Sequence, residues 1–136
     1  MTLAKEQTTD SSSNSGLSNF RITVERLLEL LNLEQEDEYG ILRQSEYAFR
    51  TAMKLIVETY DILGDGFPKA STGTDDIGSI RLAWQNVNAD RRVRLFCPHN
   101  ADEKAYIYHQ KSEEYGSEDI TSAVILVDRL KWFNEG

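Results

Sequence analysis

Residues 79–84, with the sequence SIRLAW, decide the fold because apolar and polar side chains alternate along them. A period of 2 is typical of a β-strand with one buried face. The same alternation recurs in residues 92–97 (RVRLFC) and 105–109 (AYIYH). The connectors between these runs are short and contain Asn, Asp and Pro, which are turn residues. The three runs therefore predict a three-stranded antiparallel meander.

Helical spacing replaces the alternation on both sides of this meander. The first helix is predicted from Ser18 or Asn19, although residues 20–24 also alternate with period 2, which leaves a short strand as the alternative. Ser45 is a candidate N-cap for a second helix, with a start near Ile41 as the alternative, and Gly64 ends this helix. A last helix begins near Asp119 or Thr121. The apolar stripes are Phe20, Val24, Leu27, Leu28 and Leu31; Ala48, Ala52, Leu55, Ile56 and Leu63; and Ala123, Leu126, Val127, Leu130 and Phe133.

The predicted fold class is α+β: two N-terminal helices, a three-stranded antiparallel meander, and a C-terminal helix packed on one sheet face. Residues 1–18 are rich in Ser and Thr and predict a disordered tail. Residues 19–136 form a single α+β domain. The segments 34–38, 69–78 and 113–118 read as loops because they are acidic or rich in Ser, Thr and Gly.

Composition excludes several classes of protein. The 136 residues hold 15 Lys and Arg against 23 Asp and Glu, a net charge of −8, which argues against a whole-protein polyanion binder. The mean hydropathy is −0.50. No apolar run approaches the length of a membrane span, and no secretory signal is visible. The single cysteine, Cys97, fits a reducing compartment, so we expect a cytoplasmic protein.

Candidate catalytic and metal-ligating residues are few. Cys97 and His99 are two residues apart and His109 lies on the next predicted strand, but structural zinc sites use two pairs of ligands. A Cys–His nucleophile needs a base within reach and a third group that orients it, and nothing specifies either. Adjacent carboxylates, such as those of Asp75 and Asp76, lie in predicted loops and are ordinarily solvated. We therefore predict no enzyme, no metal and no cofactor.

The polar face of the meander is the strongest candidate site. If the apolar residues of the strands point inward, alternation places a second set outward: Arg81, Arg92, Arg94, Phe96, Tyr106 and Tyr108. Residues 78–111 hold six Lys and Arg against three Asp and Glu, a net charge of +3, so the remainder of the chain carries −11. Arg and aromatic side chains are enriched in protein interfaces and in single-strand nucleic-acid sites.

A protein-interaction or regulatory module is the leading hypothesis. Single-stranded nucleic-acid binding is the alternative, disfavoured because the acidic remainder repels a polyanion and no RRM-type motif is present. An ordinary solvated face with Arg packed on Tyr is the simplest reading of all. Homodimerisation through the Leu-rich first helix is also open.

The chain also resembles a family of small uncharacterised bacterial proteins. The resemblance rests on GSIRLAW at 78–84, the strand ending at Cys97 and Pro98, YIYH at 106–109, and LKWF at 130–133. The resemblance spans roughly residues 45 to 133. The chain departs from the family pattern at Ser79, where the family often has Gly, and at Ala83, where it often has an acidic residue. Some members accompany toxin-like partners, so the resemblance implies an antitoxin-like or accessory role. The acidic remainder suits neutralisation of a basic toxin by complementary charge.

Overall fold

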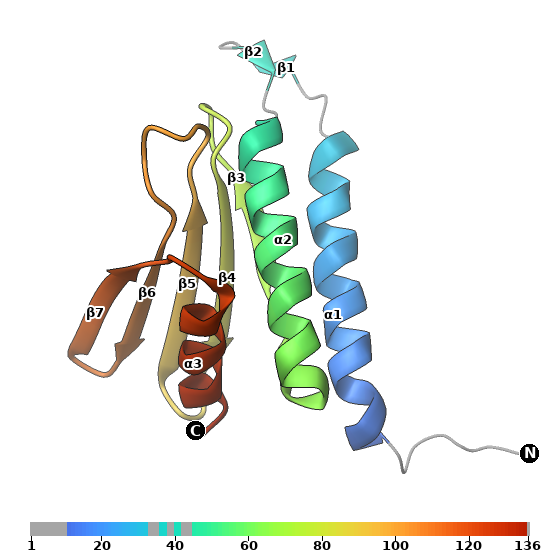
Figure 1. The fold of residues 1–136 in the computed structure, drawn as a ribbon, viewed down its shortest axis with the longest axis vertical. Helices are drawn as coiled ribbons and strands as arrows, with labels where there is room; N and C mark the ends of the chain where they lie inside the picture. The colour runs from blue at the N-terminus through green and yellow to red at the C-terminus, as the bar shows by residue number, and fades with distance from the viewer. Residues whose placement is uncertain (1–10, 33–35, 38–39, 42–44, 136) are drawn as a thin grey trace, which may run out of the picture.

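The computed structural model describes residues 11–32, 36–37, 40–41 and 45–135 (Figure 1). The N-terminal half holds α1 (Ser11–Glu29), η1 (Leu30–Asn32), β1 (Glu36–Asp37), β2 (Gly40–Ile41), α2 (Glu46–Leu63) and η2 (Gly64–Gly66). The C-terminal half holds β3 (Ser71–Thr74), β4 (Ile80–Asn86), β5 (Arg91–Cys97), β6 (Tyr106–Lys111), β7 (Glu114–Asp119) and α3 (Ala123–Asn134). The fold class is α+β, as the sequence predicts.

The main sheet has five antiparallel strands in the order β3-β4-β5-β6-β7, where the sequence predicts three. The prediction therefore misses both edge strands. β3 has the sequence STGT and β7 the sequence EYGSED, and neither carries an apolar face. An edge strand needs only its backbone hydrogen bonds to one neighbour, so its side chains can be small or charged. Composition alone reads such strands as loops.

Alternation along the central strands buries the middle of one face of the sheet. The side chains of Ile80, Leu82, Trp84, Val93, Leu95 and Ile107 are all fully buried. Trp84 is the largest of the fully buried side chains, and its Nε1 donates a hydrogen bond of 2.9 Å to the carbonyl oxygen of Pro68. Its ring therefore fills the core while its only polar atom keeps a partner.

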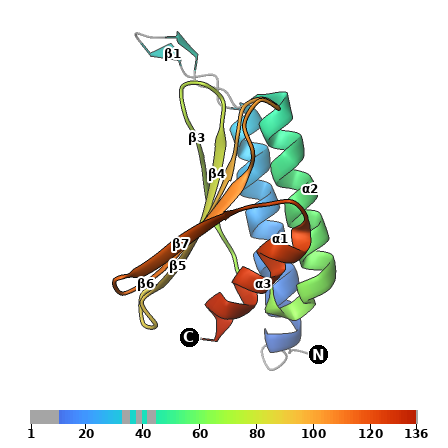
Figure 2. The ribbon, with the colours of Figure 1, turned by 60° about the vertical axis from the view of Figure 1, so that its left-hand side comes forward.

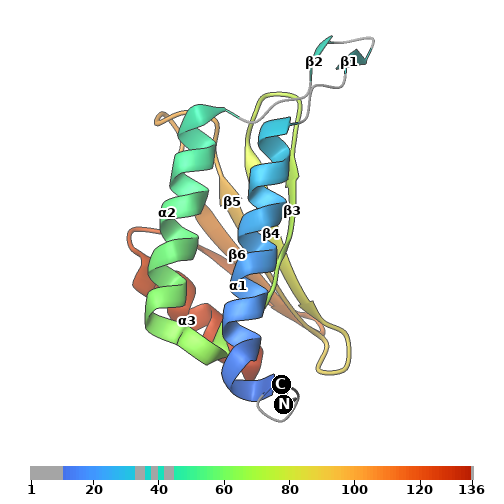
Figure 3. The same cartoon turned by 90° about the vertical axis from the view of Figure 1, so that its right-hand side faces the viewer.

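All three long helices lie on this buried side. Figure 2 shows them on one side of the sheet, and Figure 3 shows α1 and α2 side by side in front of it. Ser45 caps α2, as predicted: its hydroxyl accepts from the amide of Ala48 at 3.0 Å and donates to the carbonyl of His99 at 2.8 Å. Gly64 ends the helix with a positive φ of 53°. None of the helices in the described residues is long and apolar enough to cross a membrane.

Polar residues on α1 attach it to the segment that enters β3. The Asn19 amide donates to the carbonyl of Phe67 at 3.0 Å, and Arg26 donates to that of Ala70 at 2.8 Å. The buried hydroxyl of Thr23 accepts from the amide of Ala70 at 3.1 Å. These side chains are spaced four and three residues apart, so they share one face of α1. That face is oriented by hydrogen bonds as well as by apolar contact.

This attachment rotates α1 relative to the predicted stripe. Leu27 is buried as expected, but Leu28 and Leu31 are 43% and 46% exposed. The polar face that bonds to residues 67–70 turns these two leucines toward solvent. Helix α1 also begins at Ser11, so residues 11–18 of the predicted tail are helical, while residues 1–10 lie outside the described residues.

Gly16 is the point of closest approach between α1 and η2. A Cβ atom built at Gly16 would lie 2.2 Å from the carbonyl oxygen of Gly64 and 2.4 Å from the Cα of Asp65. Both atoms belong to the backbone, so neither can swing aside as a flexible side chain does. We therefore expect Gly16→Ala to lower the free energy of unfolding by about 1–3 kcal/mol, the range for overpacking.

Chemical denaturation measures this change, and Ser18→Ala on the exposed side of the same helix is the control. At an exposed helical site, Gly→Ala instead stabilises by about 1 kcal/mol through helix propensity. A gain in stability for Gly16→Ala would therefore contradict the close packing of α1 on η2.

Candidate functional site

The opposite face of the sheet, here called the outer face, is not covered by any described helix (Figure 2). The strand register lines its side chains up in rows across the sheet, because residues directly opposite each other point to the same side. The rows are Gly73, Arg81, Phe96, Tyr106 and Asp119; Ser71, Ala83, Arg94, Tyr108 and Ser117; and Gln85, Arg92, Gln110 and Tyr115.

Aromatic rings on this face are stacked across neighbouring strands. Phe96 and Tyr106 stack with ring centroids 5.1 Å apart, and Tyr108 and Tyr115 stack at 6.3 Å. The guanidinium of Arg94 lies over the ring of Tyr108, 5.9 Å from its centroid. Tyr108 therefore lies between a ring from β7 and a cation from β5. Such contacts hold the side chains in place without removing them from solvent.

The three arginines of the outer face lack acidic partners in the part of the chain that the structure describes. Among the described residues, no ion pair or hydrogen bond is formed by the guanidinium of Arg81, Arg92 or Arg94. The one carboxylate in the rows, that of Asp119, lies 3.8 Å from the Lys104 ammonium instead. The centre of the face is therefore an unneutralised positive surface on an acidic protein.

The part of the outer face formed by β3, β4 and β5 is hollowed. A concavity of ≈ 310 Å³ is lined by Ser71, Thr72, Gly73, Arg81, Leu82, Ala83 and Arg94. It exists because Gly73, Ser71 and Ala83 carry little or no side chain above the sheet. The two arginines thus border an open floor.

The structure brings all six predicted site residues onto this one face: Arg81, Arg92, Arg94, Phe96, Tyr106 and Tyr108. Sequence reasoning missed Tyr115, which is 70% exposed and belongs to β7. It also missed the hollow. The signal for Tyr115 was the spacing that pairs Lys111 with Glu114 in a tight hairpin, which places Tyr115 beside Gln110.

Cys97 and the histidines do not form a site. Cys97 is fully buried, and burial raises the pKa of its thiol to about 12, so the nucleophilic thiolate is suppressed at neutral pH. His109 pairs with Val93, four residues from Cys97 along β5, or roughly 13 Å at the usual strand rise. The described residues include no cluster of three His, Cys, Asp or Glu that could hold a metal.

Asp75 has a structural role in the β3–β4 turn. Its carboxylate accepts hydrogen bonds from the amides of Ile77 at 3.1 Å and Ser79 at 2.9 Å. Gly78, with a φ of 92°, supplies the positive φ in this turn. The carboxylate is thus used to shape the turn, and it does not converge with other acidic groups on a cation.

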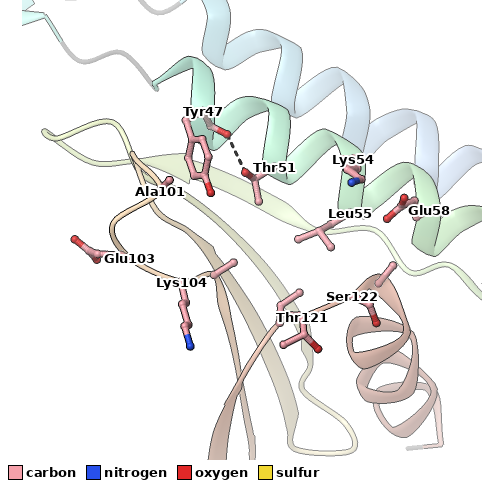
Figure 4. Close-up of a pocket in the computed structure, with 13 residues that line it drawn as sticks. Tyr47, Thr51, Lys54, Leu55, Glu58, Ala101, Glu103, Lys104, Thr121 and Ser122 are labelled. Carbon is pink, nitrogen blue, oxygen red and sulfur yellow. Dashed lines mark hydrogen bonds between the residues drawn. The ribbon is translucent and has the colours of Figure 1, made fainter.

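A second concavity of ≈ 400 Å³ lies between α2, the β5–β6 loop and the start of α3 (Figure 4). Lys54 and Glu58 line it from α2, Glu103 and Lys104 from the loop, and Ser122 from the start of α3. These polar groups are exposed, and their charges balance. The charged side chains that line the cleft therefore carry no net charge, in contrast to those of the outer face. Its lining comes from three separate segments, which is why no sequence pattern indicates it.

On the buried side, the ring of Trp132 in α3 contacts two guanidinium groups. The guanidinium of Arg91 lies 4.9 Å from its ring centroid and that of Arg129 lies 5.6 Å away. His109 contacts the same ring edge-on at 5.3 Å. The pKa of His109 is lower than its ordinary value. Burial is the largest cause, and the positive charge of Arg129 lowers the pKa further, while the negative charge of Glu118 raises it.

Comparison with known proteins identifies no relative of this chain. No family model, no curated protein and no solved structure matches it. The assignment of function therefore rests on the geometry described above.

The lowered pKa of His109 predicts an acid-sensitive fold. A base whose pKa is lower in the folded state binds fewer protons when folded, so the free energy of unfolding falls as the pH drops through 6.5, the ordinary histidine value. We expect urea denaturation to show this loss between about pH 7.5 and 5.5, where carboxylates stay ionised. His109→Gln should remove most of this pH dependence of the free energy of unfolding.

His99→Gln is the matched control, because it leaves His109 and its neighbours in place and should keep the loss. Equal pH dependence in the wild type and in His109→Gln would show that His109 is not its source.

Proposed function

We propose that this protein is an interaction module that binds a partner protein through the outer face of its sheet. The observation that carries the proposal is the set of contacts in which Arg94 lies over Tyr108 and Tyr108 stacks on Tyr115. The guanidinium groups of Arg81, Arg92 and Arg94 on the same face have no acidic partner among the described residues. Arg and Tyr are the side chains that most often dominate binding energy at interfaces. Cross-strand stacking also holds them in place before binding, which reduces the entropy lost on association.

The ring geometry favours a protein partner over single-stranded nucleic acid. Each ring of the pair Phe96–Tyr106 uses one face to stack on the other, and the same holds for Tyr108–Tyr115. A base could stack between them only by separating the pair. Asp119 of the edge strand β7 is opposite Tyr106 on this face, and its carboxylate would repel a phosphate chain that crosses there.

The charge of the outer face indicates the chemistry of the partner. Guanidinium groups that have no ion pair within the described residues, beside aromatic rings, suit a segment that carries carboxylates and apolar side chains. An antitoxin-like role, as the resemblance implies, belongs to this proposal if the partner is a toxin-like protein with such a segment. The proposed role involves no catalysis, and it places the protein in the cytoplasm, where the thiol of Cys97 stays reduced.

Affinity capture from lysate of the native host, followed by titration with the recombinant partner, tests the proposal. We expect Arg94→Glu and Tyr106→Ala each to weaken the complex by about tenfold or more, as truncation of central interface residues does. Arg50→Glu and Tyr47→Ala on α2 are matched controls, since Tyr47 and Tyr106 are similarly exposed, at 43% and 41%. The controls should bind like the wild type, and circular dichroism confirms that each variant is folded.

A single-stranded oligonucleotide of about 15 nucleotides, within the range that such modules cover, tests the alternative. Salt-sensitive binding that Arg94→Glu removes would overturn the proposal in favour of nucleic acid. Loss of the protein partner in Tyr47→Ala, with Tyr106→Ala unaffected, would instead assign binding to the cleft of Figure 4.

A further inference from the structure

We infer that the hollow beside β3 is a subsite for one carboxylate, supplied by an Asp or Glu side chain of the bound partner and held by Arg81 and Arg94. This inference rests on the proposed function and names the group that the partner must insert. Its own test, given below, does not need the partner.

The strand register sets the geometry of the subsite. Arg81 pairs with Phe96, and Arg94 pairs with Ala83, so the two arginines are diagonal neighbours on β4 and β5. Diagonal neighbours lie about 7–8 Å apart, a separation that two long guanidinium side chains can close around one anion. Both line the same concavity of ≈ 310 Å³.

The floor of the subsite is open because it lacks side chains. Gly73 lies directly opposite Arg81, and a Cβ built there meets no atom within 4 Å. Ala83 and Ser71 pair with each other in the next row. The short side chain of Ser71 donates its hydroxyl to the carbonyl of Ala83 at 3.4 Å. The hollow therefore has room for an acidic side chain.

Two guanidinium groups are suited to a carboxylate in particular. Each presents N–H donors in a planar fork that matches two carboxylate oxygens. Neither group has an ion pair within the described part of the chain, so no existing bond must break when a carboxylate enters. The neighbouring rings of Phe96 and Tyr106 offer apolar contact for the rest of the segment.

The open position at Gly73 allows a carboxylate to be introduced in place of the partner's. In Gly73→Glu the new side chain starts opposite Arg81 and reaches into the hollow without steric conflict. We expect the introduced carboxyl to have an acid dissociation constant about tenfold larger, or more, than a solvent-exposed glutamate, because two cations stabilise its charged form. Nuclear magnetic resonance titration of the side-chain carboxyl carbon measures this constant.

Ser117→Glu is the matched control, since it places a carboxyl on the outer face opposite Tyr108 instead of an arginine. Two double variants follow: Gly73→Glu with Arg81→Gln, and Gly73→Glu with Arg94→Gln. In each, the acid dissociation constant of the introduced carboxyl should move part of the way back to that of a solvent-exposed glutamate. If only Arg81→Gln does so, the carboxylate forms a simple cross-strand pair and the two-arginine subsite is overturned. A constant equal to that of Ser117→Glu overturns it as well.

The partner experiment then separates the two proposals. Gly73→Glu should block capture of the partner, whereas Gly73→Ala should retain it. A perturbed carboxyl supports the subsite even if no partner is captured, and an unperturbed one rejects the subsite even if the outer face binds a protein. Inorganic phosphate is the second probe: if it shifts the Arg81 and Arg94 side-chain resonances more than acetate at equal concentration, the subsite is assigned to phosphate and the carboxylate inference fails.

Discussion

Burial of one sheet face against helices on a single side is the constraint on which the rest of this structure depends. Trp84 and its apolar neighbours on β4 and β5 fill the space under α1, α2 and α3. Because successive residues of a strand point to opposite sides, this burial sends the intervening residues outward. Arg81, Arg92 and Arg94 are on the outer face for that reason.

The outer face carries side chains in defined positions together with arginines that have no ion pair among the described residues. Stacking across strands gives each ring a neighbour, and Arg94 lies over Tyr108, so these side chains are held in defined positions. The arginines on the buried side have polar contacts instead: Arg91 donates to the carbonyl of Trp132, and Arg129 pairs with Glu118 at 3.0 Å. Arg91 and Arg129 thus form a hydrogen bond or an ion pair, whereas the guanidinium groups on the outer face form neither in the described part of the chain. This contrast is what makes the outer face the candidate for binding.

Much of the fold and site follows from local patterns. The alternation in residues 79–84 and 92–97 assigned both faces correctly, and Ser45 and Gly64 marked the ends of α2. The edge strands could not be predicted from local patterns, because β3 and β7 are held by backbone pairing and carry no apolar pattern. Leu28 and Leu31 were assigned to the core because helical spacing cannot show which way a helix is turned. The bonds of Asn19, Thr23 and Arg26 to the chain before β3 decide that.

The sequence by itself determined which residues share a face of each strand, because the period of 2 is a property of the extended backbone. It therefore determined that three arginines and three rings lie together. Only the tertiary structure decided their register, and register sets which groups meet. It placed Arg94 over Tyr108, brought Tyr115 in from an acidic edge strand, and set Gly73 opposite Arg81 to leave the hollow open. Those contacts join neighbouring strands, and the turns between the strands set their alignment, which the alternation within each strand does not show.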